Sequence, residues 1–320
     1  MRGADYLIKR SAFAIATIFV AITINFVLFR MLPGSAVADL ARVPRATPQL
    51  KEALTEEFGL DQPMIVQYGL YLKQLARFNM GVSYANQQPV WNNLRTALFN
   101  SIPMVALGTF FAMLVGILSG VFSAWRRGTM LDYTSTNTAI AFYAVPTQWL
   151  GLMLLLIFAG KLPSYGMSDP FLLNPTPWEH FVDVMRHMIL PSLTIALTLY
   201  GEYTLIVRSA MLETLGEDYV LTARAKGLTG WNVVRKHAFR NAMLPTVTLV
   251  ALSLGYIVAG AILVETVFSW PGIGRAVYEA VLTNDYPMLQ GAFLILTLSV
   301  VACNFAADLL YFRLDPRVTE

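Results

Sequence analysis

Charged residues are scarce in this chain of 320 residues: Asp, Glu, Lys and Arg together make up 13% of it. An ordinary soluble domain contains about 25% of these residues. Hydrophobic residues, by contrast, make up 56% of the chain. This composition indicates a membrane as the solvent rather than one large core buried in water.

Cysteine and histidine are nearly absent as well. The single cysteine, Cys303, excludes a disulfide framework and a paired-cysteine metal site. The three histidines are dispersed at His180, His187 and His237, without the spacing of metal ligands. The chain also lacks a GxxxxGK[ST] phosphate loop and the GxSxG and HExxH motifs. We therefore expect no catalysis, no ATP hydrolysis and no resident metal or cofactor in this chain.

Long hydrophobic runs are what the chain does have. Five runs contain no charged residue, and a sixth is interrupted only by Glu202. They cover residues 11–29, 96–125, 133–160, 188–207, 242–264 and 286–307. Each run is near or above the roughly 20 residues that a helix needs to cross a bilayer. The fold class expected is therefore an all-α membrane protein with six transmembrane helices.

Basic residues are distributed unevenly between the two sides that these runs define. If the N-terminus is cytoplasmic, the two shorter outer loops, residues 161–187 and 265–285, contain only Lys161, Arg186 and Arg275. The inner segments hold most of the other basic residues, as the positive-inside rule requires. The long outer segment is also basic, but long translocated segments largely escape that rule. Both termini are thus predicted to lie in the cytoplasm.

The N-terminus has a second interpretation. Basic residues before an apolar run, followed by Ala36-Val37-Ala38, also resemble a cleaved signal peptide. The apolar run is longer than the usual 7–15 residues of such a peptide. The sequence Arg30-Met31-Leu32-Pro33-Gly34 also separates the run from the alanines. We therefore favour a retained first span.

Three parts follow from these boundaries. Residues 1–32 form the cytoplasmic N-terminus and first span, residues 33–95 an external segment, and residues 96–320 a core of five helices. The external segment carries its own helix signals: Thr47-Pro48 begins a helix that Gly59 ends, Pro63 begins a second, and Pro89 leads into the second span. We expect a small helical cap that packs over the outer side, with docking of a partner as the alternative.

Polar residues inside spans are costly and are therefore candidates for function. The candidates for a solute pathway or gate are Asn25, Glu202, Glu265 and Asn304. For Glu202, a bond to a neighbouring span is an equal alternative; for Glu265, the alternative is a carboxylate solvated by headgroups. The two asparagines are most simply hydrogen-bond partners between helices. Asp308, near the inner end of the last span, is expected to pair with a base such as Arg313.

The cytoplasmic stretch at about 208–241 is unusually long and polar. Within it, Tyr219, Val220 and Ala223 are spaced to share one face of a short helix, and Gly227 suits the left-handed residue that closes a helix. Such a helix could rest on the membrane surface or insert into a pocket on a cytoplasmic protein. Periodicity alone leaves both open.

A family resemblance enters at this stretch. Residues 217–228, EDYVLTARAKGL, and residues 240–245, RNAMLP, resemble the cytoplasmic loop of ABC importer permeases of the dipeptide/oligopeptide family, a version of the EAA motif. Ala223 and Gly227 match the general motif, whereas Leu221 and Thr222 replace its first two positions, as is usual in the peptide-type branch. Six further segments, in the right order, resemble the first of that family's two permease subunits. They are RMLPG at 30–34, FGLDQP at 58–63, RSAMLE at 208–213, VETVF at 264–268, PGIG at 271–274 and LDPR at 314–317.

The resemblance implies a type I ABC importer fold in the cytoplasmic (inner) membrane of a prokaryote. It implies a second homologous permease, expected to be a different chain, an extracytoplasmic solute-binding protein, and two ATPase subunits or domains that bind the ATP and Mg. Membrane lipid is an expected partner and nucleic acid is not. Coupling to the ATPases is implied for Glu217, Asp218, Tyr219, Ala223, Arg224, Ala225, Lys226 and Gly227. In that assignment Ala223 and Gly227 permit close backbone approach, and the charged residues make contacts at the rim.

Other functions are weighed against this one. The same machinery could import oligosaccharides or nickel chelates instead of peptides, although no cluster of Met and His favours nickel. A secondary transporter driven by an ion gradient would predict paired acidic residues in mid-membrane and internal repeats, and neither is visible. An intramembrane enzyme would need a nucleophile and base pair, which the sequence does not show.

Overall fold

The structure is a computed structural model that describes residues 2–31, 52, 55–56, 59, 61–243, 246, 249–250, 253 and 261–314. Within these residues the regular structure is helical, with one isolated β-bridge between Val82 and Pro89. Several predicted features lie outside the described residues: most of the helix expected to begin at Thr47-Pro48, Leu244-Pro245, most of the fifth span at 242–264, and residues 315–317. The chain divides into two compact units, residues 1–101, 258–262 and 271–320, and residues 102–257 and 263–270.

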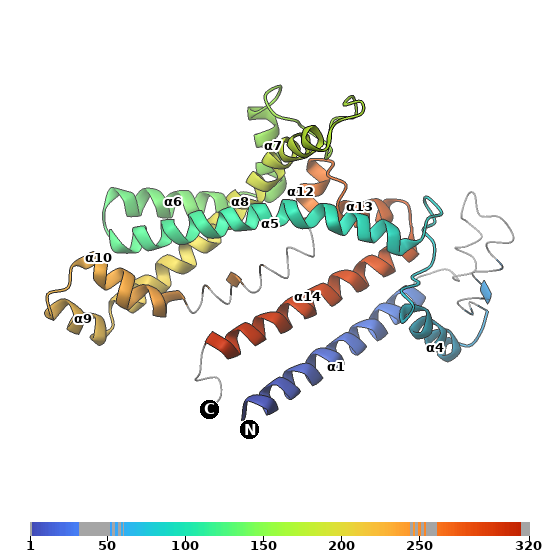
Figure 1. Cartoon of the computed structure of the whole chain (residues 1–320), viewed down its shortest axis with the longest axis horizontal. Coiled ribbons are helices and arrows are strands. Elements are labelled where there is room, and N and C mark those ends of the chain that lie inside the picture. The colour runs from blue at the N-terminus through green and yellow to red at the C-terminus, as the bar shows by residue number, and fades with distance from the viewer. Residues whose placement is uncertain are drawn as a thin grey trace. The chain divides into compact units, whose positions relative to one another are not determined.

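The first unit pairs the first and last long helices of the chain. Its elements are α1 (Arg2–Met31), α4 (Met64–Leu75), the first turns of α5 (Val90–Trp125), α13 (Ile273–Leu282) and α14 (Tyr286–Leu314). Arg10 Nη1 lies 3.2 Å from Asp308 Oδ2, and Asn25 Nδ2 donates to Gln290 O at 3.0 Å. These two contacts make α1 and α14 antiparallel neighbours, as Figure 1 shows. The start of α1 and the end of α14 therefore lie at the same end of the pair.

Asp308 pairs with a base, as the sequence predicts, and that base is Arg10 on α1. The side chain of Arg313, the base named as an example, lies outside the described side chains. Antiparallel packing explains the pair with Arg10, because it brings a base from the start of the chain alongside the end of the last helix. A contact between residues so far apart in the chain leaves no periodic signal in the sequence.

Helix α4 packs on α1 near that helix's C-terminal end. It begins at Met64 directly after Pro63, as the sequence predicts, because proline is readily accommodated at the start of a helix. The Phe26 ring lies 5.1 Å from that of Tyr68 and 5.4 Å from that of Tyr71. Burial raises the pKa of Tyr71 to about 12. Helix α4 is therefore held on α1 by aromatic packing.

A buried carboxylate ties the segment before α5 to the start of α14. Asp285 is 1% exposed and accepts hydrogen bonds from Ser83 Oγ at 2.5 Å and from the backbone N–H of Ala85 at 3.2 Å. Its other oxygen accepts from the Met288 N–H at 3.2 Å, which caps the first turn of α14. Asp285 thus fixes two parts of the first unit that are far apart in sequence.

The second unit is built around one very long helix. Its elements are the rest of α5, α6 (Met130–Ala144), α7 (Thr147–Ile157), α8 (Pro177–Leu215), α9 (Asp218–Ala225), α10 (Gly230–Val233), the π-helical turn η1 (Val234–Ala238) and α12 (Ile262–Val267). Helix α8 has 39 residues and starts with a capping box, in which Thr176 and Glu179 satisfy each other's backbone N–H groups. It passes through the whole unit (Figure 1).

Two glycines let α5 approach α8 closely. A Cβ added at Gly116 would lie 2.6 Å from the Cβ of Tyr203, and one added at Gly120 would lie 2.8 Å from Thr204 O. The two glycines are four residues apart and so lie on one face of α5, the small-xxx-small arrangement typical of helix pairs in membranes. Van der Waals contact between backbones therefore holds this pair together.

Membrane-spanning length confirms most of the predicted spans. Among the described residues, four helices are long and apolar enough to cross a bilayer: Ile8–Arg30, Val90–Trp125, Pro177–Leu215 and Tyr286–Ala306. A fifth candidate is the pair α6 and α7, which is bent by 105°. The third predicted span, residues 133–160, is thus interrupted by a sharp bend. The residue before a proline is pushed out of the helical region, and Val145, before Pro146, is extended with ψ of 127°.

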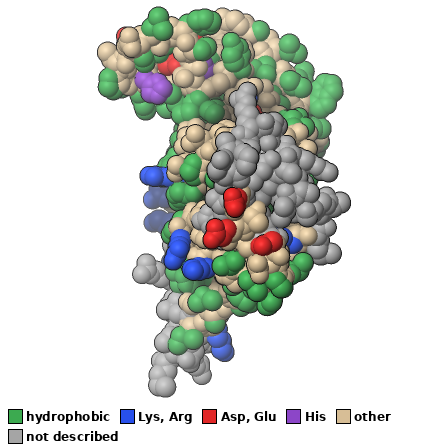
Figure 2. All heavy atoms as spheres, turned by 90° about the vertical axis from the view of Figure 1, so that its right-hand side faces the viewer, with side chains coloured by type: hydrophobic (Ala, Val, Ile, Leu, Met, Phe, Trp, Pro, Cys, Tyr) green, Lys and Arg blue, Asp and Glu red, His purple; other side chains and the backbone are tan. Residues whose placement is uncertain are grey.

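The surface of the candidate spans suits hydrocarbon. On α1, Phe13, Ile15 and Phe19 are 66%, 67% and 56% exposed. Figure 2 shows the chain from the right-hand side of Figure 1, where hydrophobic side chains occupy much of the described surface and the charged ones lie in separate small groups. Extensive apolar exposure is unfavourable in water and marks a surface that another apolar phase covers.

Candidate functional site

The predicted short helix in the cytoplasmic loop is present as α9. Helix α8 ends at Leu215, Glu217 is the N-cap of α9, and Lys226 is its C-cap. Gly227 follows with φ of +76°, the left-handed conformation that its sequence position predicts. A Cβ added at Gly227 would meet no atom within 4 Å. The glycine is therefore required here by backbone geometry and borders open space.

One face of α9 packs into its own loop. Val220 is fully buried and Ala223 is 4% exposed, and both pack against Val233, with Leu215 at the edge. The prediction that Val220 and Ala223 share a face is confirmed. The small side chain of Ala223 therefore leaves room for Val233, a residue of the same loop.

Tyr219 lies one turn before Ala223 on the same helix, but it is more exposed than Val220 and Ala223. The residue is 39% exposed, and its hydroxyl accepts a hydrogen bond from Asn241 Nδ2 at 2.8 Å. The same hydroxyl donates to His237 O at 3.5 Å. Tyr219 therefore joins α9 to the end of the loop.

The outer face of α9 combines charge with two apolar side chains. Leu221 is 52% exposed and Leu228 is 38% exposed. Around them the exposed residues are Glu217, Asp218, Thr222, Arg224, Ala225, Lys226 and Gly227. Sequence reasoning treated Leu221 only as a departure from a motif and did not single out Leu228. Their exposure beside buried Val220 and Ala223 is the structural signal that identifies them.

Behind α9, an aromatic stack attaches the loop to the end of α5. The Trp231 ring is parallel to the Phe122 ring, with centroids 5.6 Å apart and an interplanar angle of 4°. It also lies 4.9 Å from the ring of Trp125, over which the Arg126 guanidinium sits at 4.6 Å. The segment that follows α9 is therefore packed on the turn between α5 and α6.

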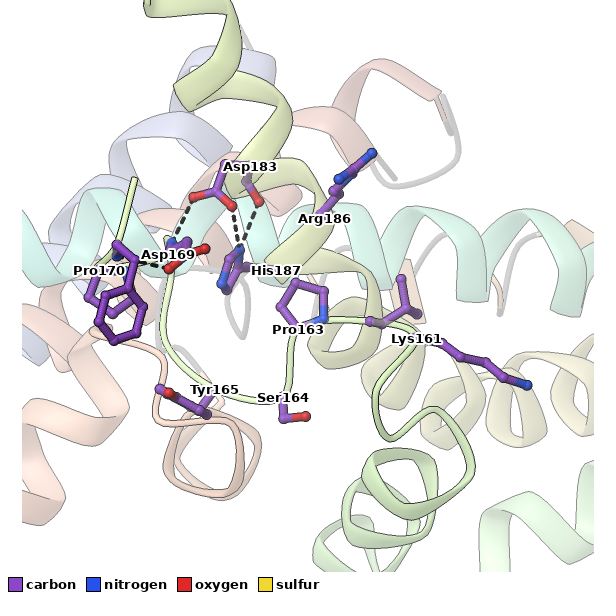
Figure 3. A pocket seen from close by; sticks show the side chains of 11 residues that line it. Lys161, Pro163, Ser164, Tyr165, Asp169, Pro170, Asp183, Arg186 and His187 are labelled. Carbon is purple, nitrogen blue, oxygen red and sulfur yellow. Dashed lines mark hydrogen bonds and ion pairs between the residues drawn. The ribbon is translucent and has the colours of Figure 1, made fainter. Parts of the chain in front are cut away.

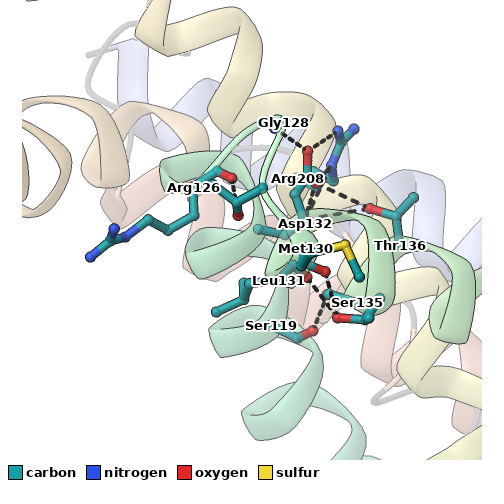
Figure 4. A network of polar contacts seen from close by, with 12 residues as sticks. Ser119, Arg126, Gly128, Met130, Leu131, Asp132, Ser135, Thr136 and Arg208 are labelled. Carbon is teal, nitrogen blue, oxygen red and sulfur yellow. Dashed lines mark hydrogen bonds and ion pairs between the residues drawn. The ribbon is translucent and has the colours of Figure 1, made fainter.

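A buried ion pair lies at the same turn (Figure 4). Asp132, in the first turn of α6, is 3% exposed and accepts from Arg208 Nε at 2.7 Å and from Arg208 Nη2 at 3.1 Å. Ser123 Oγ donates to the same carboxylate at 2.5 Å, and the Gly128 N–H at 2.9 Å. Both oxygens are thus satisfied by donors from α5, the turn and α8. Sequence reasoning missed Asp132, because its partner is 76 residues away.

The polar candidates in the spans occupy different environments. Asn25 makes the predicted bond between helices, to Gln290 O, whereas Asn304 on α14 is exposed. Glu202 on α8 is partly buried, and Glu265 on α12 is 0% exposed. Full burial of Glu265 does not fit the alternative of a carboxylate solvated by headgroups. The asparagines belong to the first unit and the glutamates to the second.

An open cavity of about 630 Å³ lies at the other end of the second unit, between residues 161–171 and the start of α8. Asp183 accepts from the Asp169 N–H at 2.8 Å, and His187 Nδ1 lies 2.9 Å from Asp183 O. Figure 3 shows Lys161 and Arg186 on the far side of His187 from Asp169. Among the described residues, no group of three or more His, Cys, Asp or Glu could hold a metal ion.

Comparison with protein families defines the class of this membrane protein. Residues 116–320 match the family described as binding-protein-dependent transport system inner membrane component, and residues 4–105 match the N-terminal part of such components. The chain belongs to this family. It is therefore a non-enzymatic permease subunit of an ABC transport system and a multi-pass protein of the inner membrane, which confirms the resemblance seen in the sequence.

Individual relatives narrow the comparison further. The chain is 35% identical to the di/tripeptide transport system permease protein DppB of Pseudomonas aeruginosa (strain UCBPP-PA14) and, equally, to the dipeptide transport system permease protein DppB of Escherichia coli (strain K12), over 98% of each chain. It is 36% identical to the probable D,D-dipeptide transport system permease protein DdpB of Escherichia coli (strain K12), over 92% of each chain.

A solved structure supports the fold alone. The inward-facing MetNI methionine ABC transporter has a chain that aligns with a TM-score of 0.53 at 19% sequence identity. The alignment covers 69% of this chain and 96% of that one. The permease fold of an ABC transporter is thus shared, and the low identity carries nothing further about the solute.

Proposed function

We propose that this permease carries short peptides as one half of the solute pathway of an ATP-driven importer. The observation that supports the solute is full-length similarity, over 98% of each chain, to relatives whose names specify dipeptide and di/tripeptide transport. The proposed partners are a second, homologous permease that is a different chain, an extracytoplasmic solute-binding protein, and two ATPase subunits or domains that bind the ATP and Mg. This chain itself binds no cofactor in the proposal.

The proposed topology has six spans, with both termini in the prokaryotic cytoplasm. Antiparallel packing of α1 and α14 supports it, because two antiparallel spans at the start and end of a chain require an even number of crossings. The described helices supply four candidates, or five with the bent pair of α6 and α7. The charge-free run at 242–264 supplies the sixth.

The proposed contact with an ATPase is the outer face of α9. Its charged and apolar residues are exposed together, and only two residues separate it from the end of α8, which reaches across the second unit. A helix seated in a groove on an ATPase would move with it as the ATPases close, a rigid-body switch. Leu221 and Leu228 would fill the groove, and Glu217, Asp218, Arg224 and Lys226 would contact its rim. Glu202 and Glu265 are the proposed polar residues of the pathway or its gate.

Reconstitution tests this function. The chain, its cognate permease, ATPases and binding protein are placed in proteoliposomes, and uptake of a labelled dipeptide, an oligosaccharide and a nickel chelate is measured with and without ATP. ATP-dependent uptake of the dipeptide alone is expected. Preference for another solute would replace the peptide assignment, and uptake that persists without ATPase subunits would indicate a secondary transporter and overturn the proposal.

A further inference from the structure

We propose that Asp132 is a positioning residue for energy coupling: its ion pair with Arg208 fixes α6 to α8, so that movement of α9 is passed to both helices. The inference rests on the proposed function, in which α9 is the element that the ATPase moves. Asp132 contacts neither the ATPase nor the solute in this scheme. It acts through Arg208.

The location of Arg208 is the first reason. Arg208 lies seven residues before the end of α8 at Leu215, or about 10 Å along the helix at 1.5 Å per residue, and α9 begins at Asp218. The inner end of α8 is thus the part of the span that a displaced α9 would move first. Helix α6 has no chain connection to α9, because it is joined to α5 by the turn after Trp125 and to α7 by Val145-Pro146. Its movement depends on its contacts with α8.

Those contacts are of two kinds. Farther along the helices, Gly201 of α8 packs closely against Ala139 and Tyr143 of α6, a non-directional van der Waals contact. The pair of Asp132 and Arg208 is different, because two hydrogen bonds between a planar guanidinium and a carboxylate fix orientation as well as distance. Separating a buried pair leaves a charge without its partner, which is strongly unfavourable. The ion pair therefore adds a fixed orientation between α6 and α8 at this point.

The donors to Asp132 make the turn a junction of three helices. Ser123 on α5 donates to the carboxylate, and the Gly128 N–H closes the turn onto it. Ser123 Oγ also accepts from Arg208 Nε at 3.2 Å. Loss of the carboxylate would thus release α5, α6 and α8 from one another at a single point.

The segment after α9 is attached to the same turn. Trp231 stacks on Phe122 and lies against Trp125, at the end of α5. Two residues therefore connect the chain on either side of α9 to the α5–α6 turn. Arg208, before α9, binds Asp132, and Trp231, after α9, packs on Phe122 and Trp125. This arrangement converts a push on α9 into movement of a block of three helices.

The inference is tested with the full transporter reconstituted in proteoliposomes. The quantity measured is the number of peptides imported per ATP hydrolysed, called the coupling ratio below. For Asp132→Asn, we expect ATP hydrolysis stimulated by the loaded binding protein to stay within about twofold of wild type, while uptake falls at least tenfold. The double variant Asp132→Arg with Arg208→Asp restores the ion pair with the charges exchanged. It is expected to import more peptides per ATP hydrolysed than Asp132→Asn does. Glu213→Gln is the control, because Glu213 is an exposed acid on α8, the helix of Arg208, and its loss should leave the number of peptides imported per ATP unchanged.

A purely structural role would give a different pattern. If uptake and hydrolysis fall in proportion in Asp132→Asn, or if the ratio is unchanged, the inference is overturned. Should Asp132→Asn fail to insert, Arg208→Lys, which keeps the charge but loses the bidentate geometry, provides the same test of the ratio. Failure of the proposed function is separate, since it would appear as absence of ATP-driven peptide uptake by the wild-type complex.

Discussion

Gly227 carries the clearest requirement for a single residue type. Its φ of +76° costs a residue with a Cβ about 1–2 kcal/mol, and more when the side chain is β-branched. The open space around it means that a side chain added there would clash with no atom of its own loop among the described residues. Gly227→Val is therefore expected to insert normally, yet to abolish ATP-dependent uptake, because the end of α9 is reshaped and its outer surface obstructed.

The control at this position is Gly227→Asn. Asparagine enters the left-handed region more readily than other residues with a side chain. It should therefore retain more uptake than the valine variant at equal levels of inserted protein, measured by immunoblot of membranes. Normal uptake by Gly227→Val would show that Gly227 is not part of the proposed contact with the ATPase.

Two neighbouring residues of α9, Leu221 and Val220, separate surface recognition from folding. Leu221 is 52% exposed, whereas Val220 beside it is fully buried. Leu221→Ala is expected to leave the thermal midpoint of the permease unchanged and to weaken its affinity for the ATPase by about tenfold, an effect of about 1.4 kcal/mol. Val220→Ala should do the reverse and destabilise the loop first, because it leaves a cavity. Comparable loss of stability in both variants would contradict the assignment of the two faces.

At the scale of elements, helix pairing depends on the glycines of α5. An alanine at Gly116 would place its Cβ 2.6 Å from that of Tyr203, so α5 and α8 must move apart. Gly116→Ala should lower the thermal midpoint in detergent by several degrees. Gly69→Ala is the matched control, because a Cβ there meets no atom within 4 Å and alanine favours a helix by about 1 kcal/mol over glycine. An unchanged midpoint for Gly116→Ala would mean that the two helices are not closely packed.

The same elements show what a sequence can predict. Helix positions follow from local features: charge-free runs predict α5 and α14, and the run interrupted only by Glu202 predicts the middle of α8. Pro63 and Gly227 correctly mark one helix start and one helix end. The bend at Val145-Pro146 was missed, because hydropathy is continuous through it and only the proline interrupts the helix. Apolar length therefore predicts where a span lies and says little about its shape.

Contacts between distant residues are the part that sequence could not supply. The pairs of Asp132 with Arg208, Asp285 with Ser83 and Asp308 with Arg10 join residues separated by 76 or more positions. Each partner is one of several equivalent residues in the sequence, and only the folded chain selects among them. The surface of α9 was partly predictable, since the motif located the helix, but its exposed leucines required knowledge of which face Val233 covers.

At the scale of the whole molecule, an experiment can test whether the chain crosses the membrane an even or an odd number of times. Antiparallel α1 and α14 place the start of the first helix and the end of the last on one side of the membrane. The chain has a single cysteine, so a Cys303→Ser background allows labels to be introduced one at a time. In that background we expect Lys9→Cys, Lys226→Cys and Glu320→Cys to react with an impermeant maleimide only after the cells are permeabilised. Lys161→Cys, in an outer loop, should react in intact cells.

The pattern of labelling distinguishes six spans from five. If the region at 242–264 did not cross the membrane, an odd number of crossings would place positions 9 and 320 on opposite sides, and one of them would react in intact cells. Reaction of position 9 alone would also conflict with the positive-inside distribution of the basic residues. Labelling of position 226 from outside would place α9 where no cytoplasmic ATPase could reach it. Protection of all three inner positions, with position 161 exposed, therefore links the topology of the chain directly to the proposed role of α9.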